Sequence, residues 1–201
     1  MSAEHGASHG RERLSLDVVR AFALAVAKAE PHTGAHHAET ARFAVRLARR
    51  LRLGQATTRL VRMGAQLHDL GKIGVPGSIL LQPRRLSQSE FAVIREHPRI
   101  GWEIMSQIGS AGPLATVILQ HHEHLDGTGY PGGLGGGDIM DESLVVATAD
   151  ITQALVSRRS YQSEAGLGWI VRTLDSASGS HLPPRYVDAA IDLMRSDMAA
   201  S

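Results

Sequence analysis

Apolar residues recur along most of this chain at the three- and four-residue spacing of α-helices, and no segment shows the strict alternation of a strand followed by a hairpin turn. Helices are predicted to begin near Leu14, Pro98 and Pro113, and to span about 35–53, 55–70, 87–97, 142–156, 165–174 and 184–198. Gly54 is expected to cap the end of the helix over 35–53, and Ser87 with Glu90 has the spacing of a capping box. The predicted fold class is therefore all-α: about seven to nine helices in one domain over residues 14–201, after a disordered segment over residues 1–13.

Composition narrows the class of protein. The 201 residues are 43% hydrophobic and 20% charged, as in ordinary globular proteins, and the formal net charge of +1 gives no reason to expect a binder of nucleic-acid polymers or of membrane surfaces. The absence of cysteine excludes disulfides, zinc–thiolate sites and a thiol nucleophile. With no signal peptide and no apolar run of about 18 residues, we expect a cytoplasmic protein. An anionic ligand would need a local source of positive charge.

Histidines and carboxylates stand at marked places in the helical pattern. The candidates are His32 and His36, four residues apart; His68 beside Asp69; His97 at a helix junction; the adjacent His121 and His122; and Asp150 in an apolar helix. Each has an ordinary alternative when taken alone, namely a polar helix end or a solvated helix face. Together, in a chain without cysteine, they fit a helical bundle that directs nitrogen and oxygen ligands inward to two metal ions. The residues alone thus indicate a di-metal hydrolase.

Longer strings carry a family resemblance. They are PHTGAH (31–36), LHDLGKIGVPGSIL (67–80), LSQSEFAVIREHPRIGWEIM (86–105), HHEHLDGTGYPGGL (121–134), ATADITQALVSRRSY (147–161) and GSHLPPRYVDA (179–189). In this order and spacing the chain resembles the HD-GYP domains of the HD phosphohydrolase superfamily over about residues 15–198. The resemblance implies a single HD-domain helical bundle and a bacterial second-messenger phosphodiesterase. It would hydrolyse cyclic di-GMP to linear pGpG, GMP or both, through a hydroxide that bridges two metal ions.

The same resemblance assigns site residues. It implies that the metal ligands are His36, His68, Asp69, His97, His121, His122 and Asp150, with Asp69 bridging the two ions. It also implies that Lys72 protonates the leaving oxygen or holds a phosphate, that Arg159 holds a phosphate, and that Gly129, Tyr130 and Pro131 form the GYP motif. Iron or manganese is the expected metal, with nickel or zinc as alternatives.

The Gly-rich run around residues 127–137 lacks the Lys-Ser/Thr and the preceding strand of a phosphate-binding P-loop, so we interpret it as a mobile loop at the mouth of the site. Tyr130 in that loop either contacts the ligand or anchors the loop on the fold, and the sequence does not choose between these roles.

The chain departs from the family pattern mainly around the expected substrate pocket. His32 stands where some members carry a glutamate that supports a third metal; a histidine can also bind metal, so His32 is a further candidate ligand, but the replacement argues against a third ion. Glu30 stands where aspartate is frequent. Ser160 replaces a proline, and Gln162 replaces a basic residue, which removes a positive charge from the phosphate pocket. We therefore group Glu30 and Gln162 with Lys72, Tyr130 and Arg159 as substrate-contact candidates.

Two alternatives to a cyclic di-GMP phosphodiesterase follow from these departures. One is a phosphohydrolase acting on another cyclic dinucleotide or a nucleotide. The other is a module that binds a cyclic dinucleotide or a protein partner without turnover, against which the full set of candidate ligands argues. The oligomeric state stays open, and either a homodimer or a signalling partner is compatible with the sequence.

Overall fold

The computed structural model describes residues 17–26, 34–82, 84–158 and 164–200, which are helices and their connections. A first helix is described over residues 17–26. The others are α2 (Gly34–Arg50), α3 (Gln55–Leu67), the 3-10 helix η1 (Leu70–Gly74), α4 (Gly77–Leu80), α5 (Gln88–Ile94), α6 (His97–Ser106), α7 (Gly112–Gln120), the 3-10 helix η2 (Gly136–Asp138), α8 (Asp141–Arg158), α9 (Glu164–Ala177) and α10 (Pro184–Ala199). The only extended pairings among these residues are two isolated bridges. The predicted all-α class is confirmed.

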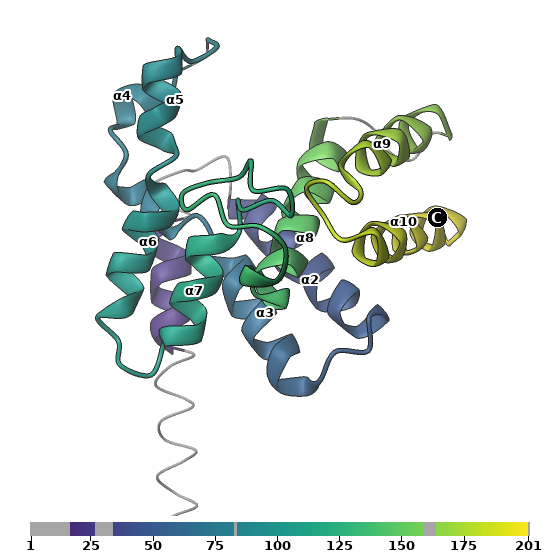
Figure 1. Ribbon diagram of the computed structural model, residues 1–201, viewed down its shortest axis with the longest axis horizontal. Coiled ribbons are helices and arrows are strands. Elements are labelled where there is room, and N and C mark those ends of the chain that lie inside the picture. Colours follow the sequence, from purple (N-terminus) through teal and green to yellow (C-terminus); the bar gives the residue numbers. More distant parts are fainter. Residues whose placement is uncertain (1–16, 27–33, 83, 159–163, 201) are drawn as a thin grey trace, which may run out of the picture.

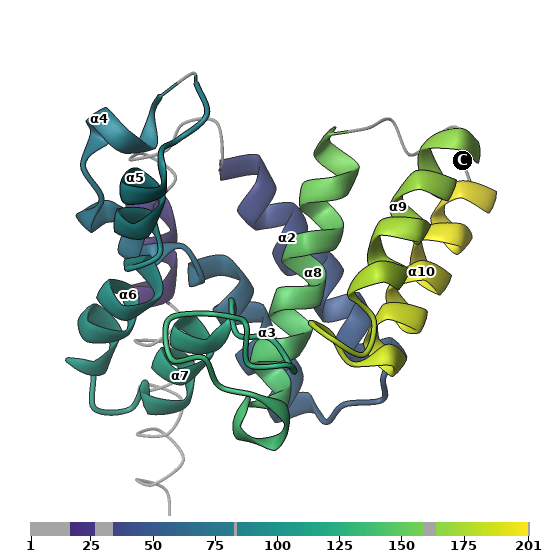
Figure 2. The same cartoon turned by 45° about the horizontal axis from the view of Figure 1, so that its top comes forward.

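The helices pack around a central pair. Helices α2 and α8 run side by side, α3 packs against both, and α9 with α10 closes one end of the bundle (Figures 1 and 2). At the other end α6 packs on α7 and η1, and α4 and α5 project outward. None of the described helices combines the length and the apolar character needed to cross a membrane.

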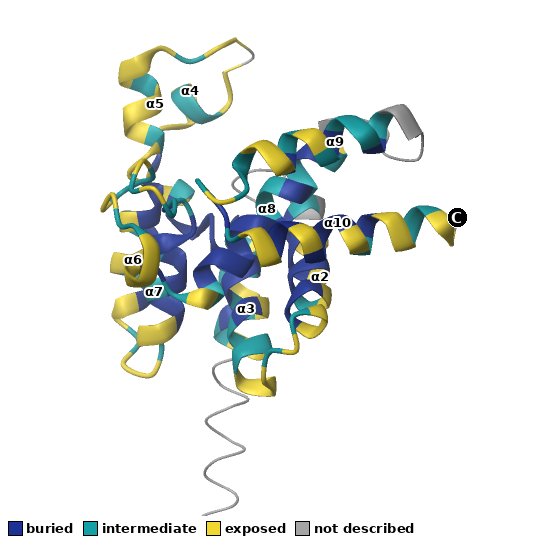
Figure 3. Ribbon diagram, turned by 45° about the vertical axis from the view of Figure 1, so that its right-hand side comes forward, coloured by how far each residue is buried: buried dark blue, intermediate teal, exposed yellow. Residues whose placement is uncertain are grey.

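Two apolar clusters hold this arrangement. The larger joins α2, α3, α8, α9 and α10 through fully buried side chains such as Leu47, Val146 and Ile170. The smaller lies where α3 ends against α6 and α7, around Leu67 and Ile118. Figure 3 shows the buried residues concentrated on the facing sides of α2, α3, α7 and α8, with the outer faces of α5 and α10 exposed. Helix α3 contributes residues to both clusters and so joins the two parts of the bundle.

Local signals in the sequence explain several helix starts. Ser87 accepts a hydrogen bond from the Glu90 N–H, and the Glu90 side chain accepts one from the Ser87 N–H, so the predicted capping box is confirmed. Pro98 and Pro113 each lie in the first turn of their helix, as predicted.

The predicted capping role of Gly54 is wrong. This glycine has an extended backbone and precedes α3 as its N-cap. The end of α2 is closed instead at Arg52, whose φ of 58° is left-handed, while the Leu53 N–H bonds back to the Ala48 carbonyl at 2.9 Å.

A close backbone approach sets the position of the residues after α3. That helix ends at Leu67, three residues earlier than predicted, and the chain tightens into η1. At Gly71 in η1, a Cβ atom would overlap the backbone oxygen of His97. Because glycine has no Cβ, η1 can lie directly on the start of α6. This brings the segment with His68 and Asp69 next to His97.

Candidate metal centre

The side chains that the sequence marks as metal-ligand candidates converge between the helices. They are His36 from α2, His68 and Asp69 from the turn after α3, His97 from the start of α6, His121 and His122 from the end of α7, and Asp150 from α8. Six of these residues form two groups of three whose donor atoms lie within 4.8 Å of one another. The Asp69 carboxylate contacts one histidine of each group.

The first group gathers around the two carboxylates. His36 Nε2 lies 2.9 Å from Asp150 Oδ1, and His68 Nε2 lies 3.5 Å from the same oxygen. His68 Nε2 also lies 3.3 Å from Asp69 Oδ2. A single cation in this space would therefore have two imidazole nitrogens and two carboxylates as donors.

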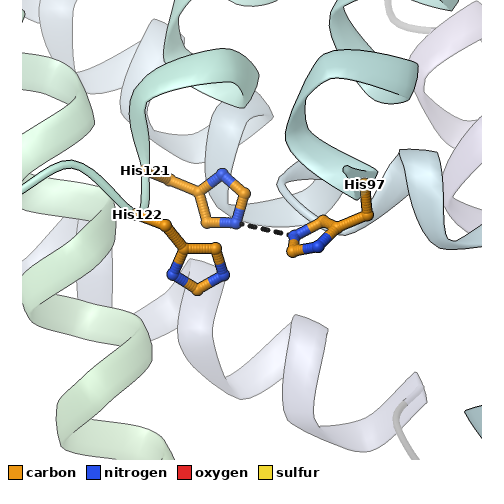
Figure 4. Close-up of side chains that lie close together, drawn as sticks. All are labelled: His97, His121 and His122. Carbon is orange, nitrogen blue, oxygen red and sulfur yellow. Dashed lines mark hydrogen bonds between the residues drawn. The ribbon is translucent and has the colours of Figure 1, made fainter. Parts of the chain in front are cut away.

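The second group consists of His97, His121 and His122 (Figure 4). His97 Nε2 lies 3.3 Å from His121 Nε2 and 3.3 Å from Asp69 Oδ1. The rings of His121 and His122 have centroids 4.0 Å apart. Asp69 thus directs one oxygen to each group, which is the arrangement of a carboxylate that bridges two ions.

A shared hydrogen bond orients three of the imidazoles. Nδ1 of His68, His97 and His121 donates to the backbone carbonyl three residues earlier, at 3.0, 2.8 and 2.7 Å. A neutral ring has one proton, so a donating Nδ1 leaves Nε2 with a lone pair. The Nε2 atoms of His97 and His121 therefore present lone pairs to each other, which is favourable only with a cation between them. Donors about 2.0–2.2 Å from one ion lie about 3 Å apart, so the observed spacing fits a metal.

Burial and neighbouring charges set the protonation of the donors, keeping His121 and His122 neutral and favouring a positive charge beside Asp69 and Asp150. Burial lowers the pKa of His121 well below its usual value and that of His122 to about 3, and neighbouring imidazoles add to both effects. Burial would also lower the pKa of His68, but the carboxylates of Asp69 and Asp150 raise it to about 9. Two ionised carboxylates thus favour a positive charge between them, and a divalent metal provides one.

Lys72 reaches the centre from η1. Its Nζ donates to Asp69 Oδ2 at 2.8 Å, so the ammonium lies beside the carboxylate between the two groups. The structure also places His37 here, a residue that no sequence pattern marks as a ligand. His37 is 6% exposed, and its Nε2 donates to the same oxygen at 3.1 Å. The adjacent His36 is marked in the sequence because it lies four residues after His32, the spacing of one helix face. The direction in which His37 points depends on how α2 packs.

The loop after α7 covers one side of the centre. The Tyr130 ring stacks on His122 with centroids 4.7 Å apart, and the Arg95 guanidinium lies 4.9 Å from the centre of the Tyr130 ring. Glu123, 1% exposed, accepts the N–H bonds of Gly132 at 2.6 Å and Leu134 at 2.9 Å. The buried Glu123 carboxylate therefore anchors the loop, and Tyr130 packs on His122 at the edge of the candidate metal centre. Sequence reasoning missed Glu123 and Arg95.

Several predictions from the sequence fall outside the described residues. They concern the segment 1–13, the helix start near Leu14, and Glu30, His32, Arg159, Ser160 and Gln162.

The chain matches the HD domain family over residues 20–185. It is 40% identical over 152 residues to the cyclic di-GMP phosphodiesterase response regulator RpfG of Xanthomonas campestris, a match that covers 72% of this chain and 39% of that protein. It is 35% identical over 146 residues to the 3'3'-cGAMP-specific phosphodiesterase 3 of Vibrio cholerae, with 73% of this chain and 32% of that protein covered. The chain spans about two fifths of the length of several curated relatives that it matches.

Solved structures show the same fold. The HD domain of the Listeria monocytogenes phosphodiesterase PgpH, determined in complex with cyclic-di-AMP, superposes with a TM-score of 0.65 at 19% identity. The match covers 89% of this chain and 95% of that domain.

Proposed function

Since the chain belongs to the HD domain family and, within it, to the HD-GYP branch, we propose that it is a metal-dependent phosphodiesterase that hydrolyses cyclic di-GMP to linear pGpG, GMP or both. The observation that carries this proposal is the position of Asp69, whose two oxygens each face a separate group of buried metal donors. A bridging carboxylate between two such groups is the arrangement expected of a di-metal phosphodiesterase.

We assign one divalent ion to each group. Asp69 would serve both ions; His36, His68 and Asp150 would hold one, and His97, His121 and His122 the other. Nitrogen and oxygen donors suit iron, manganese, nickel and zinc; we propose iron or manganese, with nickel or zinc as alternatives. When bound, the ions supply a nucleophile at neutral pH and stabilise negative charge on the phosphate.

Lys72 is proposed as the general acid. Hydrolysis breaks a phosphorus–oxygen bond, and the departing ribose oxygen needs a proton. The Lys72 ammonium is held 2.8 Å from Asp69 Oδ2, beside the carboxylate that would bridge the two ions. From there it can donate a proton to the leaving oxygen or a hydrogen bond to the phosphate.

Tyr130 is proposed to form one wall of the substrate pocket, because its ring already lies against the ligand candidate His122. Glu30, Arg159 and Gln162 remain proposed substrate contacts on the strength of the sequence resemblance alone. A third ion at His32 is not proposed.

A second substrate has its own support. The chain is 35% identical to a cyclic-GMP–AMP-specific relative, and Gln162 with Ser160 changes the expected phosphate pocket. A mixed cyclic dinucleotide such as 3'3'-cGAMP is therefore the alternative to cyclic di-GMP.

The test is hydrolysis by protein purified without oxygen and loaded with Mn(II) or Fe(II). Cyclic di-GMP and 3'3'-cGAMP are assayed in parallel, the products are separated by chromatography, and bound metal is counted in the same sample. We expect about two ions per chain at the centre around Asp69 and faster turnover of cyclic di-GMP. Faster turnover of 3'3'-cGAMP would move the assignment to the alternative substrate.

Matched variants test the site itself. Asp69→Asn and His68→Ala should lose metal and turnover, whereas Asp188→Asn, the same chemical change as Asp69→Asn at an exposed residue of α10, should keep both. Normal hydrolysis by Asp69→Asn and His68→Ala would overturn the site. Full metal loading without turnover of either substrate would overturn the catalytic proposal and indicate a binding module.

A further inference from the structure

A second histidine–carboxylate group lies outside the metal centre, where the loop after α7 meets the turn between α9 and α10. It consists of His124, Asp126 and His181, whose potential ligand atoms lie within 4.8 Å of one another. Backbone bonds fix the two segments together, since the Leu125 N–H donates to the His181 carbonyl at 3.2 Å and the Asp126 N–H donates to the Ser180 carbonyl at 2.9 Å. The three side chains are therefore brought together by the fold and not by chance rotamers alone.

Thr128 orients two of the three side chains. Its hydroxyl donates to Asp126 Oδ1 at 2.6 Å, and its backbone N–H donates to the same oxygen at 3.0 Å. Because the hydroxyl proton is used there, the hydroxyl oxygen accepts from His124 Nδ1, which lies 3.0 Å away. The remaining lone pair of His124 is then on Nε2, and Asp126 keeps Oδ2 available. A partner that fixes both the tautomer of a histidine and the free oxygen of a carboxylate is typical of the surroundings of metal ligands.

We propose that His124 Nε2, Asp126 Oδ2 and His181 Nε2 bind a divalent transition-metal ion, distinct from the centre at Asp69. Two imidazoles and a carboxylate suit zinc, and the partial exposure of the group leaves room for water as a further ligand. The two rings stack at 4.0 Å with planes 15° apart, and His181 Nε2 lies 3.9 Å from Asp126 Oδ2. Binding requires the His181 ring, on a side chain that is 42% exposed, to turn so that the three donors approach to about 3 Å of one another.

The ion would tie the loop that contains Tyr130 to the end of the bundle formed by α9 and α10. Its role would be to hold the loop, since none of its ligands lies in either group around Asp69. Zinc bound here should raise the unfolding temperature of the chain, because a ligand that binds only the folded state stabilises it.

The test uses zinc as the probe and the full chain. Zinc is titrated against the unaltered protein and against His181→Ala, Asp126→Asn and Thr128→Val, with bound metal counted after equilibrium dialysis. We expect one zinc fewer per chain in His181→Ala and Asp126→Asn, and an affinity at this site about 10–100-fold weaker in Thr128→Val. Asp175→Asn, at an exposed residue of α9, is the control for the loss of a surface carboxylate.

Asp69→Asn separates this site from the proposed catalytic centre, because it should lose metal there and still bind the zinc that His181→Ala loses. Unfolding curves recorded in the presence of a chelator show which variants fold. If a ligand variant does not fold, the zinc affinity of Thr128→Val tests the site in its place. Unchanged zinc stoichiometry and affinity in His181→Ala and Asp126→Asn would overturn the proposal. The proposal would also be overturned if Asp69→Asn bound no zinc, because all of the zinc bound by the unaltered chain would then depend on the centre around Asp69.

Discussion

Replacing Glu123 with glutamine tests how the loop around Tyr130 is held, because the change removes a charge and keeps the size of the side chain. The carboxylate is 1% exposed and accepts two backbone N–H bonds, from Gly132 at 2.6 Å and from Leu134 at 2.9 Å. A glutamine carbonyl can accept one of these bonds. Its amide NH₂ would then face the other N–H, and two donors cannot bond to each other.

The expected cost follows from the lost bond. A hydrogen bond to a charged group contributes about 1.5–3 kcal/mol, so Glu123→Gln should weaken the anchored loop by about that amount. Since about 1.4 kcal/mol is a factor of ten, the anchored loop should become about 10–100-fold less favoured relative to its released forms. If substrate needs Tyr130 against His122, kcat/KM should fall by up to the same factor.

Three measurements separate this effect from damage to the centre. Bound metal should stay at the level of the unaltered chain, the unfolding midpoint should fall, and kcat/KM for cyclic di-GMP should decrease. Glu103→Gln, the same change at an exposed residue of α6, should alter none of them. If Glu123→Gln keeps the original midpoint and kcat/KM, the two backbone bonds do not hold the loop, and the reasoning fails. If the variant loses metal, Glu123 acts through the neighbouring His122 instead.

Three further changes address other parts of the site. Gly71→Ala places a Cβ where the backbone of α6 lies, so it should lower the free energy of unfolding by about 1–3 kcal/mol or more and reduce bound metal. Denaturant unfolding and metal counting measure these effects. Gly77→Ala, with open space around the new Cβ, should change neither. His37→Leu removes a donor from the shared carboxylate and should lower metal-free stability in urea by about 1.5–3 kcal/mol, with a smaller loss for His37→Gln; equal losses would count against the hydrogen bond. Arg95→Ala removes the cation from the Tyr130 ring, a contact of about 0.5–1 kcal/mol, so KM should rise about two- to five-fold and recover in part in Arg95→Lys; an unchanged KM would show that this contact does not position the ring.

The helical class could be predicted because most helix signals are local. Periodicity, the pair Ser87 and Glu90, and the two prolines at helix starts each act within one or two turns. The error at Gly54 arose where the connection between two helices is only a few residues long. A glycine there can end the first helix or precede the second, and Arg52 took the left-handed conformation that glycine usually provides. Helix packing decides between these outcomes, and it is not encoded in a short window of sequence.

The candidate ligands could be proposed from the sequence because each stands at a helix end or in an apolar helix. Their grouping could not, since it depends on which helix ends meet in space. His37 shows the limit clearly. Adjacent residues on a helix point about 100° apart, so whether His36, His37 or both face Asp69 depends on the rotation of α2 against the end of α3. The sequence also gives no indication that Thr128 joins His124 to Asp126, because that contact needs the folded loop.

The charge of the proposed centre resolves an apparent conflict in the sequence. The chain carries a net charge of only +1, yet the proposed substrate has two phosphates and so two negative charges. Asp69 and Asp150 bring two negative charges to the centre, and burial keeps the imidazoles of His121 and His122 neutral. Two divalent ions would leave this space with a surplus of about two positive charges, since the charge of the Lys72 ammonium would be offset by that of the hydroxide nucleophile, and this is enough to balance a cyclic dinucleotide. In a partly water-excluded site such a surplus acts more strongly than the same charge spread over the surface. The protein therefore needs no basic face to bind an anion, provided that the metal is present. Nearly equal numbers of basic and acidic residues are thus compatible with an anionic substrate.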